Sequence, residues 1–190
     1  MKRWLAIAGI IALSALAGCS DTGSGTKTTT AQVSPTKPVT ITQGRLCDLL
    51  LHFFDVELNV PDLQSEPSAE SDRRKTLESH AVCTIRQGHK TVGRWESRVD
   101  ASLDPTEGDS SFDEQLELGQ TVMVGDQRAD PSARYPVLLA TRVGGWNSRL
   151  SITGPEIETR NGPLQLTDTD VENAAQFLIT MTDRLDSGKF

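Results

Sequence analysis

The stretch that decides the fold is AVCTIRQGHKTVGRWESRVDASL, residues 81–103. Its apolar and charged side chains alternate from residue 94 onward. Trp95, Val99, Ala101 and Leu103 fall on one parity, and Arg94, Glu96, Arg98 and Asp100 fall on the other. A period of two is typical of a β-strand that buries one face. Since Gly88-His89-Lys90 separates this strand from residues 81–87, the simplest interpretation is a β-hairpin.

Two further segments carry apolar side chains at helical spacing. Residues 44–57 predict a short amphipathic helix before the hairpin. A longer helix is predicted after a capping box formed by Thr167 and Asp170, and it ends near Gly188. The apolar positions are Leu46, Leu49, Leu50, Phe53 and Phe54 in the first helix, and Val171, Ala174, Ala175, Leu178, Thr182 and Leu185 in the second.

The remaining segments complete an antiparallel sheet. We expect a polar loop at 61–75 and one or two helical turns opened by a capping box at 111–114. Strands are expected at 120–124, 135–143 and 148–153. One short edge strand is expected between residues 155 and 161. The order of elements predicts an α+β fold. In it, a sheet built from hairpins is packed on one face by the short N-terminal helix and the long C-terminal helix.

The N-terminus has the pattern of an export signal. Two basic residues precede an apolar run over residues 4–17, which is shorter than the roughly 20 residues that a transmembrane helix needs. The run ends in Leu16-Ala17-Gly18-Cys19, and on this motif the chain resembles bacterial lipoproteins. The resemblance implies a signal peptide at 1–18, lipidation of Cys19 and attachment to the extracytoplasmic face of the cell membrane. An ordinary signal peptide or an uncleaved anchor is the alternative.

The composition separates a tether from a domain. Residues 19–42 are rich in Ser, Thr, Gly and Pro and are expected to form a flexible tether, and residues 43–190 are expected to form one globular domain. The whole chain has 190 residues, 36% of them hydrophobic, and a formal net charge of −7. These values exclude a polytopic membrane protein and a fully disordered chain. The acidic excess argues against nucleic-acid binding, which needs clustered cations.

Two cysteines remain once Cys19 carries lipid. In an exported chain the pair Cys47 and Cys83 favours a disulfide, which would join the first helix to the first strand. Free thiols or a metal site are the alternatives. No third cysteine and no histidine at ligand spacing supports a metal site.

The order of motifs also resembles a group of actinobacterial lipoproteins that carry a domain of unknown function. The shared features are Cys47-Asp48-Leu49-Leu50 at the first helix, Cys83 near the first strand, and a late hairpin and C-terminal helix over residues 137–185. The chain departs from that pattern at Leu46, where the group has proline, and at Ile85, where it has an aromatic residue. The resemblance implies an envelope protein with a fold similar to extracytoplasmic sensor domains, and it implies no reaction.

The sequence offers few candidates for catalysis. His52, His80 and His89 are the three histidines, and each falls where an exposed imidazole is expected. No nucleophile elbow, zinc-protease motif, phosphate loop or EF-hand loop occurs. An acidic segment with Asp104, Glu107, Asp109 and Asp113 has irregular spacing that favours a solvated loop over a calcium site. We therefore expect no metal and no cofactor.

The turn Gly144-Gly145-Trp146-Asn147 is the candidate recognition surface, because an indole at a hairpin tip is either exposed or folded back over its own sheet. The leading hypothesis is a monomeric, lipid-anchored envelope protein that binds an unknown protein or small molecule without catalysis. One alternative is an envelope hydrolase with His52 or His80 as base. The other is a carrier with an apolar cavity between sheet and helix.

Overall fold

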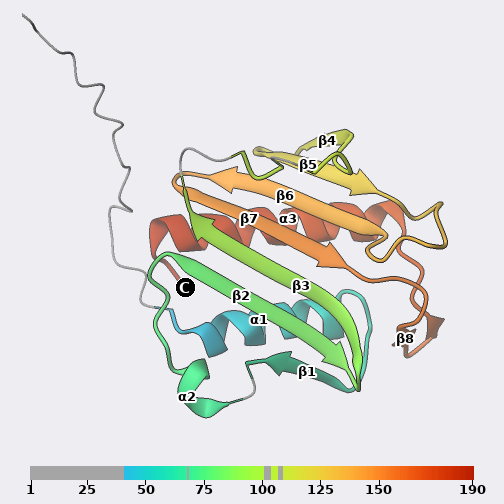
Figure 1. The fold of residues 1–190 in the computed structure, drawn as a ribbon, viewed down its shortest axis with the longest axis horizontal. Helices are drawn as coiled ribbons and strands as arrows, with labels where there is room; N and C mark the ends of the chain where they lie inside the picture. Colours follow the sequence, from blue (N-terminus) through green and yellow to red (C-terminus); the bar gives the residue numbers. More distant parts are fainter. Residues whose placement is uncertain (1–40, 68, 101–103, 107–108) are drawn as a thin grey trace, which may run out of the picture. The chain divides into compact units, whose positions relative to one another are not determined.

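The computed structural model describes residues 41–67, 69–100, 104–106 and 109–190. The predicted signal peptide at 1–18, the predicted lipidation site Cys19 and residues 20–40 of the predicted tether lie outside this part of the chain. A seven-stranded antiparallel sheet, in the order β1-β2-β3-β7-β6-β5-β4, is the centre of the fold (Figure 1). Its strands are β1 (Leu63–Glu66), β2 (His80–Gln87), β3 (Lys90–Val99), β4 (Glu114–Glu117), β5 (Thr121–Asp126), β6 (Val137–Val143) and β7 (Trp146–Ile152).

The predicted hairpin at 81–103 is confirmed as β2 and β3. Trp95 lies opposite Cys83 on β2 and opposite Leu150 on β7, and all three residues are buried. The charged parity of β3 is exposed or half-buried, as the alternation predicts. The strand ends at Val99, and the predicted positions Ala101 and Leu103 lie outside the described residues.

Two helices pack on the same face of the sheet. Helix α1 (Gln43–Val56) contacts β1 and β2, and helix α3 (Asp168–Ser187) contacts β6 and β7 (Figure 1). The rings of Phe53 in α1 and Phe177 in α3 stack with centroids 4.5 Å apart, so the two helices meet above the centre of the sheet. A Cβ atom at Gly93 would overlap the ring of Phe54, because α1 packs directly against β3 there. The predicted α+β fold with its two helices is confirmed.

The C-terminal helix follows the sequence pattern closely. The Thr167 side chain accepts a hydrogen bond from the Asp170 amide, and the Asp170 carboxylate accepts one from the Thr167 amide at 2.8 Å. These reciprocal bonds satisfy amide groups that the first turn leaves unpaired. Gly188 ends the helix in the left-handed region, with φ of 67°. All six predicted apolar positions are buried.

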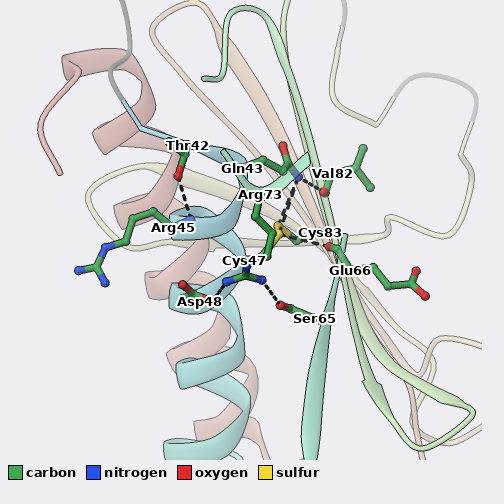
Figure 2. The surroundings of a disulfide bond; sticks show 10 residues. All are labelled: Thr42, Gln43, Arg45, Cys47, Asp48, Ser65, Glu66, Arg73, Val82 and Cys83. Carbon is green, nitrogen blue, oxygen red and sulfur yellow. Dashed lines mark hydrogen bonds and ion pairs between the residues drawn. A yellow bond between two sulfur atoms is a disulfide. The ribbon is translucent and has the colours of Figure 1, made fainter. Parts of the chain in front are cut away.

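A disulfide between Cys47 and Cys83 joins α1 to β2, as predicted. The two Cα atoms lie 5.4 Å apart, and both residues are fully buried. Figure 2 shows Gln43, one turn before Cys47, beside the bond: its side-chain amide donates to the Val82 carbonyl and lies 3.6 Å from the Cys83 sulfur. The covalent bond and the amide together hold the start of α1 on the sheet.

Three segments differ from the predictions. The stretch 61–75 is not only a loop, since it contains β1 and the short helix α2 (Glu70–Arg73). Residues 111–114 do not open a helix, because the Asp113 amide donates to the Val124 carbonyl and the chain continues as β4. Pairing along the sheet overrides the local capping pattern. The short strand after residue 155 is β8 (Glu158–Thr159), and it pairs with β9 (Gly162–Pro163) instead of the edge of the main sheet.

The domain also begins earlier than predicted. Ile41 is buried, and its carbonyl accepts a hydrogen bond from the Leu77 amide at 3.0 Å. Thr42 caps α1 by accepting a hydrogen bond from the Arg45 amide. The last two residues of the predicted tether therefore belong to the folded part.

Replacing both disulfide cysteines by alanine should lower the free energy of unfolding by about 4 kcal/mol, because the bond closes a loop over a sequence separation of 36 residues in the unfolded chain. Urea titration of the oxidised wild type and of the C47A/C83A variant measures the difference. The reduced wild type is the matched control and should resemble the double variant. Equal stability of the oxidised wild type and the double variant would contradict the prediction.

Candidate functional site

The face of the sheet opposite the helices carries the charged side chains of β3. Trp95 and Leu150 are paired in the core, so their neighbours Glu96 and Arg149, also paired, point to the other side. We call this side the open face. On the three central strands it comprises Arg94, Glu96 and Arg98 of β3, Asn147, Arg149 and Ser151 of β7, and Leu138, Ala140 and Arg142 of β6.

Two connections lie over the open face and enclose a cavity of about 340 Å³, which we call the first cavity. The connection between β3 and β4 contributes Phe112, and the connection between β5 and β6 contributes Arg134 and Tyr135. Leu138 forms part of the apolar lining. The other polar residues that line the cavity are Asp109, Ser111, Gln127, Arg149 and Ser151.

Arg149 lies at the centre of the open face. Its Nε donates a hydrogen bond to the Pro105 carbonyl, and its guanidinium carbon lies 5.6 Å from the centroid of the Phe112 ring. The Oδ2 atom of Asp109 lies 3.8 Å from Nη1, which makes an ion pair but is beyond hydrogen-bonding distance. The backbone carbonyl and the ring therefore orient this guanidinium, and Asp109 makes a long ion pair with it.

Arg134 is an exposed residue that also lines the first cavity. Its guanidinium carbon lies 5.2 Å from the centroid of the adjacent Tyr135 ring. Within the described residues it makes no hydrogen bond or ion pair. A cation held over an aromatic face keeps its N–H donors free for other acceptors.

A second, smaller cavity of about 180 Å³ lies on the other side of Arg149. It is lined by Glu96, Arg98, Pro105, Asn147 and Arg149. The Oδ1 atom of Asn147 is buried and has no hydrogen-bond partner among the described residues, while its Nδ2 donates to the Asp100 carbonyl. Arg149 thus separates two polar hollows on one sheet face.

An ion-pair network fixes the wall that carries Arg134. The Arg128 guanidinium donates to both carboxylate oxygens of Asp126, to the Leu166 carbonyl at 3.0 Å and to Asp168 at 2.6 Å. These bonds tie the start of the β5–β6 connection to the first turn of α3. The hydrogen bond from Arg128 is the main cause that holds the pKa of Asp126 below its ordinary value of 3.8.

The predicted recognition residues lie deeper than the sequence suggests. Trp146 is fully buried on the core face of β7, opposite Val99 and Val143. Of the two alternatives for this indole, exposed or folded back over its own sheet, the exposed one does not occur, because the turn is made by Gly144 and Gly145 alone and Trp146 already belongs to the strand. Asn147 is 5% exposed, but it does line the second cavity.

The histidines lie on separate elements. His52 is exposed on α1, His80 begins β2, and His89 lies in the turn at the other end of β2. His80 Nε2 is 3.6 Å from a carboxylate oxygen of Glu96. The structure brings none of the three beside a hydroxyl or thiol nucleophile within its described residues.

The acidic segment is organised by local hydrogen bonds. The Asp104 carboxylate accepts bonds of 2.7 Å from both the amide and the hydroxyl of Thr106, and these bonds lower its pKa. Glu107 lies outside the described residues. Among the residues that are described, no group of three His, Cys, Asp or Glu side chains is arranged to hold a metal ion.

The residues that line the first cavity could not be predicted from the sequence. Phe112, Arg134 and Tyr135 belong to connections, where no periodic pattern indicates which side chains turn toward the sheet. The one signal available was the charged parity of β3, which identifies an exposed face but not the loops that cover it. Arg149 also lacked a signal, since a single arginine in a strand is ordinary.

The chain matches no protein family model, no curated protein and no solved structure. Within the described residues no helix is long and apolar enough to cross a membrane. The cavities, their charges and the residues around them are therefore the observations from which a function is argued.

The pKa of Asp126 predicts how stability changes with pH. A carboxylate whose pKa is lowered on folding stabilises the protein above its unfolded pKa, and this stabilisation is lost as the pH falls below about 4. Asp126→Asn should lower the unfolding free energy at neutral pH by about 1 to 2 kcal/mol, since it removes charge-assisted hydrogen bonds. It should also lose less stability than the wild type on acidification. Urea titrations at neutral and acidic pH measure both effects.

Asp113→Asn serves as the control, because it removes one exposed carboxylate whose side chain makes no hydrogen bond to a described residue. If the wild type and Asp126→Asn lost equal stability between neutral and acidic pH, the assigned role of the Arg128 pair would be wrong.

Proposed function

We propose that the chain is a lipid-anchored protein on the extracytoplasmic face of the cell membrane, and that it binds a ligand or partner at its open face without catalysing a reaction. The observation that carries the proposal is the polar, arginine-lined first cavity on that face. Both long helices, the disulfide and the core residues occupy the other face or the interior. The open face is thus a surface with charged groups that the two helices do not cover.

The motif Leu16-Ala17-Gly18-Cys19 supports the anchored location, because it follows a basic start and an apolar run. The disulfide between Cys47 and Cys83 is consistent with export, since such bonds persist in oxidising compartments. A lipid at Cys19 would hold the protein, while an acidic mature chain would be repelled by anionic headgroups. We therefore propose a monomer that stands away from the membrane surface and presents the domain to partners.

The two alternatives gain no observation in their favour. A hydrolase with His52 or His80 as base needs a nucleophile within hydrogen-bond reach, and neither histidine has one among the described residues. A carrier of an apolar ligand needs space between sheet and helices. That region is occupied by large buried side chains such as Trp95, Phe54 and Leu178.

The anchor is tested by Cys19→Ser. We expect the wild type to partition with membranes and to carry an added lipid mass at Cys19, and the variant to lose the lipid and appear in the soluble envelope fraction. Membrane fractionation and mass spectrometry of the mature protein measure both. A variant that stays firmly bound to the membrane, with an unchanged mature mass apart from the substitution, would refute the lipoprotein proposal.

The recognition face is tested by site-specific photo-crosslinking in the native envelope. A photoreactive side chain at position 98 on the open face should capture a partner, and the same side chain at Glu172, an exposed position on α3, should not. The two positions are matched in exposure and differ in the face that they probe. Capture from position 172 alone would place recognition on the helix face and overturn the proposal.

A further inference from the structure

The first cavity is lined by two guanidinium groups and one carboxylate. Arg134 makes no ion pair within the described residues, and Arg149 makes a long one with Asp109, with 3.8 Å between Nη1 and Oδ2. With Asp109 as the one carboxylate in its lining, the cavity has an excess of one positive charge. The chain as a whole has a net charge of −7, so this local excess runs against the overall balance.

An aromatic ring lies beside each of the two cations. Tyr135 supports Arg134 at 5.2 Å, and Phe112 supports Arg149 at 5.6 Å. A ring attracts the flat face of a guanidinium but accepts no hydrogen bond in its plane. The in-plane donors of Arg134 and the terminal nitrogens of Arg149, whose Nε binds the Pro105 carbonyl, can therefore bind a carboxylate or a phosphate.

The size and lining of the cavity restrict the ligand further. A volume of about 340 Å³ lies at the lower end of the roughly 300–1,000 Å³ found for small-molecule sites. The hydroxyls of Ser111 and Ser151 and the amide of Gln127 line the same space as the Leu138 side chain. This mixture suits a polar ring with hydroxyl groups, and it does not suit a long acyl chain.

Resting on the proposed binding function, we infer that the first cavity is a site for a small organic anion of about monosaccharide size, which carries one carboxylate or phosphate group. Arg134 and Arg149 hold the anionic group between them. The serine hydroxyls and the Gln127 amide contact the polar body of the ligand, and Tyr135 and Phe112 keep the guanidinium groups in position.

The binding test uses the full-length lipidated protein in detergent micelles and isothermal titration calorimetry. The probes are D-glucuronate, D-glucose 6-phosphate, D-glucose and inorganic phosphate. Binding of glucuronate or glucose 6-phosphate, with glucose binding at least about tenfold more weakly, is the expected result. The first two probes distinguish a carboxylate from a phosphate ester, and inorganic phosphate shows whether the sugar body contributes. No binding by either anionic sugar, or equal binding of glucose, would overturn the inference.

Variants locate the site. Arg134→Gln and Arg149→Gln should each weaken binding of the anionic sugar at least about tenfold. Arg149→Lys keeps the positive charge but loses the bidentate guanidinium, so it should also weaken binding. This variant controls for a loss of binding that is caused by unfolding when the charge is removed. Arg94→Gln is the matched control, because Arg94 lies on the same open face and does not line the cavity. An equal loss of affinity in Arg94→Gln would overturn the assignment of the site. It would show that the anion is attracted by the general positive charge of the open face and not by the two arginines of the cavity.

The outcome is separable from the proposed function. If neither anionic sugar binds but position 98 still captures a partner, the ligand inference is wrong and the binding function stands. If the anionic sugar binds through Arg134 and Arg149 while capture occurs from position 172 alone, the cavity assignment stands and the open face is not the surface that recognises the partner.

Discussion

The pairing of β3 with β7 is the interaction on which the rest of the structure depends. It joins the N-terminal part of the sheet, β1-β2-β3, to the C-terminal part, β7-β6-β5-β4. Two buried hydroxyls reinforce it: Ser97 donates to the Asn147 carbonyl at 3.1 Å, and Ser148 donates to Ser97 at 2.8 Å. Because each helix packs mainly on one part, this ladder also brings α1 and α3 together over one core.

The same ladder sets the chemistry of both faces. A strand places successive side chains on opposite sides, so the register that pairs Trp95 with Leu150 in the core also pairs Glu96 with Arg149 on the open face. A slip by one residue would expose the indole and bury the arginine. The cost of burying an unpaired charge and exposing a large ring therefore fixes the position of the proposed site together with the core.

Local patterns predicted the elements whose formation depends on nearby residues. The capping box at Thr167 and the β3 alternation are such cases, and the even pair of cysteines needed only the expectation of export. Elements that depend on distant partners were not predictable. Strand β4 has four residues and forms because β5 is beside it, and Trp146 is buried because β7 begins immediately after the two-glycine turn. The first cavity is the extreme case, since its walls come from connections that lack any period.

The arginines of this chain show why the first cavity differs from an ordinary structural contact. Arg128 donates hydrogen bonds to Asp126, Asp168 and the Leu166 carbonyl. These bonds balance its charge and fix its orientation. Arg134 contacts the ring of Tyr135 instead, and its N–H donors make no hydrogen bond to a described residue. Contact with an aromatic face orients an exposed guanidinium without neutralising it. Carboxylates neutralise Arg128, which connects two elements, whereas a ring contacts Arg134 at the cavity. The positive charge of Arg134 therefore stays available at the proposed anion site.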